Sequence, residues 1–143
     1  MTVIGHLILS FIHGSAHDGA DVALPPWSML FVLVVILAGP VVGLALVWPA
    51  PRLGAWVVAV TMGASLLFGV VNHFLLPGPD HVAHVAEPWR RLFATTAALL
   101  AVTEALGCSL ALRMARQTRS ADDAVPARAE RPHGRLDPQA PLH

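Results

Sequence analysis

The chain has little charge, a single cysteine and no lysine. Charged residues make up 13% of its 143 residues, and nine arginines balance nine acidic residues. Soluble proteins carry about 25% charged residues, and nucleic-acid-binding domains present a basic surface. The low, balanced charge argues against a soluble domain and a nucleic-acid partner. With Cys108 as the only cysteine, a disulfide within the chain and a thiolate pair for a soft metal are also excluded.

Motifs of hydrolytic enzymes are absent as well. The sequence has no G-x-S-x-G motif, no glycine-rich phosphate loop and no H-E-x-x-H metalloprotease motif. We therefore expect a protein that is not an enzyme.

Long apolar runs dominate the sequence. Apolar residues make up 55% of the chain, and the mean hydropathy is +0.63. These values predict an all-α integral membrane protein in which residues 1–116 form one helical bundle in the lipid bilayer. Three runs are long enough to cross the bilayer as helices. They are residues 27–48, 53–76 and 92–112. In the first run, Pro40 should kink the helix, and Gly39 with Gly43 should allow a neighbouring helix to approach closely.

The N-terminal segment is shorter and carries a polar stripe. A turn of 100° per residue places His6, Ser10, His13 and His17 on one narrow face of a helix. A helix over residues 2–17 would be about 24 Å long, a little short of the hydrocarbon core of about 30 Å. We expect this segment to form a short fourth span.

The C-terminal segment, residues 117–143, has few large apolar side chains and shows no periodicity, so we expect a disordered tail. Arginines gather just before it, at Arg113, Arg116 and Arg119, and they outnumber the pair at Arg90 and Arg91. By the positive-inside rule the tail should be cytoplasmic in a multi-pass protein of the bacterial inner membrane. The segment before the third span should then lie outside.

Side chains able to bind metal gather at this expected outer face. They come from VVNHFLLPGPDHVAHVAEPWRR, residues 70–91, and from the end of the N-terminal helix. Imidazole and carboxylate groups are the usual ligands of divalent zinc, nickel and copper. We therefore predict a non-enzymatic protein that binds such an ion in a transport, accessory or sensor role. The candidate ligands are His13, His17, His73, Asp80, His81, His84 and Glu87.

Two other functions fit the same pattern. His13 and His73 each lie about one turn from the outer end of their helices, as the axial ligands of a b-type haem or the lining of a quinone pocket would. The protein would then be a subunit of an electron-transfer complex. Alternatively, it is a structural subunit that packs through its small residues, as a homo-oligomer or in a larger membrane complex.

Asn72 and Glu104 are polar residues within the apolar runs. Glu104 shares a helix face with Ala97 and Ala101, so it should point into the bundle. A carboxyl group in an apolar medium needs to be protonated or to accept from a partner. Glu104 is thus a candidate for proton or cation passage. The alternative is a structural hydrogen bond to Thr61, to Ser65 or to a carbonyl freed by Pro40.

Overall fold

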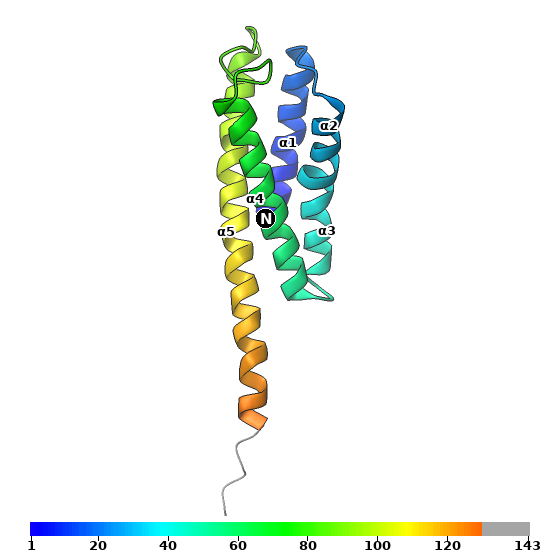
Figure 1. Cartoon of the computed structure of the whole chain (residues 1–143), viewed down its shortest axis with the longest axis vertical. Coiled ribbons are helices and arrows are strands. Elements are labelled where there is room, and N and C mark those ends of the chain that lie inside the picture. The colour runs from blue at the N-terminus through cyan, green and yellow to red at the C-terminus, as the bar shows by residue number, and fades with distance from the viewer. Residues whose placement is uncertain (130–143) are drawn as a thin grey trace, which may run out of the picture.

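The computed structural model describes residues 1–129, and these residues form helices joined by turns and loops (Figure 1). The helices are α1 (Thr2–Gly19), α2 (Pro26–Phe31), the π-helix η1 (Val32–Ala38), α3 (Gly39–Leu46), α4 (Pro51–Val70), the π-helix η2 (Val71–Leu75) and α5 (Arg90–Ala129). The segments α2, η1 and α3 follow one another without a break, as do α4 and η2. The described chain contains no strand, and the predicted all-α fold is confirmed.

Three helical rods of the described chain are long and apolar enough to cross a membrane. They are Pro26–Leu46, Pro51–Leu75 and Arg90–Ser120, with 21, 25 and 31 residues. At most 33% of the most apolar part of each rod is buried in the bundle, so most of its apolar side chains face outwards, as they do in lipid. The three long spans predicted from the apolar runs match these rods.

Helix α1 is not among those three rods, and its role as a fourth span stays a prediction. It packs beside α5 and turns its histidines, His6, His13 and His17, into the bundle. Its opposite face exposes Ile4, Ile8 and Phe11. This helix is thus polar towards the protein and apolar towards the outside, the reverse of an amphipathic helix in a soluble protein.

The first rod departs from α-helical geometry just before Pro40. Proline has no N–H for the carbonyl four residues earlier, and its ring crowds that carbonyl, which belongs to Ile36. The chain widens here into η1, in which the Gly39 N–H donates to the Val34 carbonyl five residues back. The Ile36 carbonyl instead accepts a hydrogen bond of 2.9 Å from Nε2 of His6 on α1.

Small residues bring α3 close to α4. A Cβ atom built at Gly43 would lie 2.7 Å from Cγ2 and 2.8 Å from the backbone nitrogen of Val58. A Cβ atom at Gly39 would lie 2.5 Å from Cγ2 of Thr61. The close approach expected of these glycines therefore occurs between two helices of the same chain.

Helix α5 continues through Ala129, past the boundary at residue 117 where we expected a disordered tail to begin. Extending an existing helix costs far less than starting one, and the residues after Arg113 include the strong helix formers alanine, arginine and glutamine. This part of α5 projects beyond the other helices (Figure 1). The rest of the predicted tail, residues 130–143, lies outside the described residues.

The contact at Gly43 predicts a difference between two glycine substitutions. Gly43→Ala should lower the free energy of unfolding by about 1 to 3 kcal/mol, because the added methyl group meets the backbone of α4. Gly14→Ala is the control, since no atom lies within 4 Å of its Cβ position and alanine favours a helix. Thermal unfolding in detergent should show a lower midpoint only for Gly43→Ala. Equal midpoints for Gly43→Ala and the wild type would contradict the close contact.

Candidate metal centre

Three histidines meet at one end of the bundle. His13 and His17 lie near the C-terminal end of α1, and His73 lies on η2. That end of α1 and the loop between η2 and α5 lie at the same end of the molecule, which we call the loop end (Figure 1). One ring nitrogen of each histidine lies within 4.8 Å of the others, and the three residues are only 7, 8 and 7% exposed. We call them the histidine trio.

Helix geometry and one aromatic ring hold the trio together. His13 and His17 are one turn apart on α1, with ring centroids 4.9 Å apart. Phe93 on α5 is fully buried, and its ring lies 4.6, 4.8 and 5.2 Å from the rings of His13, His17 and His73. No sequence pattern singled out Phe93, which lies one turn before Thr96, the residue that accepts a hydrogen bond from His13.

A second proline fixes the loop over the site. Pro77 cannot donate to the carbonyl four residues earlier, which belongs to His73. The Val82 N–H of the loop donates to that carbonyl at 3.0 Å. The loop is thereby attached to the end of η2, and the backbone around His73 is fixed.

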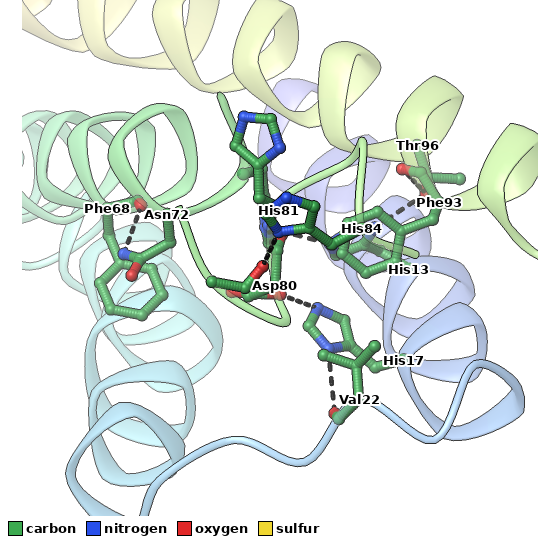
Figure 2. Close-up of polar contacts among 12 residues, drawn as sticks. His13, His17, Val22, Phe68, Asn72, Asp80, His81, His84, Phe93 and Thr96 are labelled. Atoms are coloured by element: carbon green, nitrogen blue, oxygen red, sulfur yellow. Dashed lines mark hydrogen bonds and ion pairs between the residues drawn. The ribbon is translucent and has the colours of Figure 1, made fainter. Parts of the chain in front are cut away.

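The hydrogen bonds of His13 define its tautomer. Its Nδ1 lies 2.8 Å from Oγ1 of Thr96 (Figure 2). The Thr96 hydroxyl donates its only proton to the Leu92 carbonyl at 2.8 Å. The threonine oxygen must therefore accept from the His13 Nδ1–H. In the neutral ring, Nε2 of His13 then carries a lone pair and no proton.

His17 and His73 have the same arrangement. Nδ1 of His73 donates to the backbone carbonyl of Asp80 at 3.0 Å, and Nδ1 of His17 donates to the Val22 carbonyl at 3.4 Å. Because a carbonyl oxygen can only accept, both rings carry their proton on Nδ1. All three neutral imidazoles therefore have an unprotonated Nε2.

Two of these unprotonated nitrogens face each other. The Nε2 atoms of His13 and His73 are 3.2 Å apart, and two lone pairs at this distance repel unless a proton or a cation lies between them. Metal–imidazole bonds of about 2.0 to 2.1 Å at a tetrahedral angle place two nitrogens about 3.3 Å apart. Histidine ligands also commonly donate their other N–H to a carbonyl or carboxylate, as these do. The trio could therefore hold a metal ion.

Asp80 adds a negative charge beside the trio. Its Oδ1 lies 3.3 Å from Nε2 of His17 and 3.3 Å from Nδ1 of His73, and this buried atom has no hydrogen-bond partner in the described chain. Burial alone would raise the pKa of Asp80, but the imidazoles of His73, His17 and His13 together hold that pKa below its ordinary value. The carboxylate is therefore ionised at neutral pH, and its Oδ1 and the unprotonated Nε2 of His17 repel each other unless a cation or a proton lies between them.

The other predicted ligands are not part of this group among the described residues. His81 donates from Nε2 to the Phe74 carbonyl at 3.3 Å and accepts at Nδ1 from the Ala83 N–H at 3.2 Å, so neither ring nitrogen is free. His84 donates from Nδ1 to the Gly78 carbonyl at 2.7 Å. Glu87 is exposed and lies 3.6 Å from Arg90. The two histidines satisfy backbone groups of a tight loop, and the structure does not bring them together with the trio.

The spacing within the trio does not suit haem. Two axial ligands on opposite sides of an iron atom would be about 4 Å apart at ordinary metal–imidazole bond lengths. The Nε2 atoms of His13 and His73 are closer, at 3.2 Å, and a porphyrin has no room between them. The pair fits two neighbouring ligands of one small ion better than the two faces of a haem.

A cavity of about 550 Å³ connects the trio with the interior of the bundle. At the loop end it is lined by the trio and Asp80, and deeper by Ser65, Leu100 and Glu104. Glu104 is buried, and its partner is a residue that we had not paired with it: Oε1 lies 3.5 Å from Nδ1 of His6. Asn72 takes no part, since its amide donates to the Phe68 carbonyl of its own rod at 2.8 Å (Figure 2).

Comparison with known proteins finds no family model, no curated protein and no solved structure that matches this chain. The chemistry of the site is therefore inferred from its own geometry. Three neutral imidazoles, a neighbouring carboxylate and an adjoining cavity form a site that could hold a metal ion.

The hydrogen bond from His13 to Thr96 predicts that Thr96→Val lowers the stability of the protein. Thr96→Val keeps the shape of the side chain but removes the acceptor of the buried Nδ1–H, so the free energy of unfolding should fall by about 1 to 3 kcal/mol. Thr103→Val, on the exposed side of the same helix, removes only a bond to the Leu99 carbonyl and should have little effect. Chemical unfolding in detergent measures both. If the two variants lose the same stability, the proposed tautomer of His13 is wrong.

Proposed function

We propose that this chain is a multi-pass protein of the bacterial inner membrane that binds a divalent transition-metal ion through His13, His17 and His73 at its extracytoplasmic face. The observation that carries the proposal is the shared state of the three rings. Each donates its Nδ1–H to a neighbouring oxygen and leaves an unprotonated Nε2 in the group. The lone pairs on these nitrogens repel one another, and a metal ion placed between them would form one bond with each ring.

The ligand set favours zinc, nickel or divalent copper. Imidazole nitrogen suits these ions, and with Cys108 as its only cysteine the chain has no thiolate pair for monovalent copper. Three protein ligands leave a fourth position open, as in zinc sites that bind a further group. The Asp80 carboxylate, 3.3 Å from Nε2 of His17, supports the charge of the ion from the edge of the site. An open position and an adjoining cavity are consistent with a transport, accessory or sensor role.

The proposed topology rests on the arginines of α5. Arg113 and Arg116 lie towards the end of this helix that is remote from the loop end, and the positive-inside rule then puts that end and the following residues in the cytoplasm. The trio would take its ion from the extracytoplasmic side. Arg90 and Arg91 at the loop end are fewer than the arginines towards the other end.

Metal titration of the purified protein in detergent tests the proposal. We expect about one zinc, nickel or copper ion per chain, and loss of this binding in His13→Ala and in His73→Ala. The double variant His81→Ala with His84→Ala is the matched control and should still bind, because these rings are held by the loop backbone. Calorimetry and elemental analysis give the stoichiometry. If the wild type binds no ion, or the trio variants bind as it does, the proposal fails.

Asp80 should contribute to affinity without being required for it. Asp80→Asn removes the charge beside His17 and His73, and changes to such supporting groups typically weaken metal binding by about 10- to 100-fold. Asp21→Asn is the control, since Asp21 is an exposed carboxylate in the turn after α1. The dissociation constants of both variants come from the same titration. Unchanged affinity in Asp80→Asn would remove this residue from the site.

The cavity favours quinone binding as a second candidate function. Its volume of about 550 Å³ is ordinary for a small-molecule site, and its lining includes Leu33, Leu37 and Phe68 as well as the polar groups at the loop end. The hydroxyl groups of a reduced quinone could donate hydrogen bonds to the unprotonated imidazole nitrogens there. Solvent extraction of the purified protein followed by mass spectrometry would reveal a quinone, and its absence together with metal binding would leave the first proposal alone.

A further inference from the structure

His6 and Glu104 form a second polar group, deeper in the bundle than the histidine trio. His6 is fully buried and Glu104 is 4% exposed, with Nδ1 of the histidine 3.5 Å from Oε1 of the glutamate. The two residues come from α1 and α5, far apart in the sequence. Neither the trio nor the metal chemistry proposed above uses them.

The hydrogen bond to Ile36 defines the proton on His6. Nε2 of His6 donates to the Ile36 carbonyl that Pro40 leaves free, so in the neutral ring Nδ1 has a lone pair. This Nδ1 is a buried atom without a hydrogen-bond partner in the described chain, and it faces the Glu104 carboxyl. A lone pair and an ionised carboxylate repel each other, so a proton between them is favoured while no cation balances the charge of the carboxylate.

The proton belongs on Glu104 in the resting state. A buried ion pair of imidazolium and carboxylate would lose the hydration of two charges, whereas a neutral acid facing a neutral imidazole loses none. Glu104 lines the cavity that the trio also lines, and His6 lies behind it. The proton is thus held where the cavity offers a route to the loop end.

Charge balance links the two groups. A divalent cation at the trio adds two positive charges to a poorly hydrated space that the Glu104 carboxyl group also lines. Loss of the proton from Glu104 offsets one of these charges. His6 and His13 are seven residues apart on α1, or about 10 Å, a distance over which charges interact strongly away from water.

We propose that His6 and Glu104 hold one exchangeable proton at the inner end of the cavity, and that a divalent cation bound by the histidine trio displaces it. The inference rests on the proposed metal binding and adds cation-for-proton exchange to it. The O–H bond of Glu104 breaks, its electron pair stays on the carboxylate, and the proton leaves through the cavity to water. The carboxylate then faces the cavity and the bound cation.

Few other titratable groups face this pair in the described chain. Segments α2, η1 and α3 carry no titratable side chain, and α4 carries only Arg52, in its first turn. On α5, Cys108 lies one turn from Glu104, beside Gly63. The other titratable groups that line the cavity are at the loop end. They are His13, His17, Asp18, His73 and Asp80.

Calorimetry of zinc binding in buffers with different ionisation enthalpies measures the protons released per ion. Glu104→Gln is the informative variant, because the glutamine amide can donate to Nδ1 of His6 and preserve the contact. We expect it to bind zinc and to release about one proton fewer than the wild type. Glu87→Gln, at an exposed carboxylate of the loop, is the matched control and should release as many protons as the wild type.

Infrared difference spectroscopy of the wild type gives a second measurement that needs no variant. Addition of zinc should remove the carbonyl stretch of a protonated carboxylic acid, because the proposed exchange turns the buried Glu104 carboxyl group into a carboxylate. Zinc binding with equal proton release in Glu104→Gln, or with no loss of this band, would overturn the exchange but leave the metal site intact. A wild type that binds no divalent ion would overturn both proposals.

Discussion

Each buried imidazole of this bundle donates one N–H to an oxygen atom, and the arrangement of the helices at the site follows from that requirement. Without water, an unpaired N–H in an apolar bundle is costly. His6 therefore joins α1 to η1 through Ile36, and His13 joins α1 to α5 through Thr96. The same bonds leave the second nitrogen of each ring unprotonated. The interactions that hold the helices together thus also leave nitrogen atoms that could bind a cation.

Two prolines free backbone carbonyl groups that then accept hydrogen bonds at the two polar groups. Pro40 frees the Ile36 carbonyl for His6, and Pro77 frees the His73 carbonyl for the Val82 N–H of the loop. A π-helix lies beside each proline, η1 before Pro40 and η2 before Pro77. Breaks in the helical hydrogen-bond pattern are tolerated in an apolar bundle when another group takes the free carbonyl. Here the His6 ring donates to the Ile36 carbonyl, and the Val82 N–H donates to the His73 carbonyl. Both donors belong to segments that form the two polar groups.

The sequence predicted the spans and part of the site. It predicted features that depend on one segment, and it missed those that depend on how segments pack together. Length and hydropathy are properties of single segments, so the three long rods could be read directly. The helical period put His13 and His17 on one face, and the order of the spans brought them to the same end as His73. Whether a loop histidine points inwards depends on the turn it belongs to, and His81 is held by backbone groups of its own loop. The pairing of His6 with Glu104 depends on the rotation of α1 against α5, which the sequence does not encode locally.

Helix α1 carries residues of both the histidine trio and the His6–Glu104 pair. The rigidity of this helix limits the ways in which one group can affect the other. His6, His13 and His17 lie on the buried face of one continuous helix, so helical geometry fixes the separation between His6 and the two histidines that α1 contributes to the trio. No hinge lies between them, since α1 runs unbroken from Thr2 to Gly19. An effect of one group on the other therefore passes through the electric field in the shared cavity, where charges are weakly screened, and needs no rearrangement of the bundle.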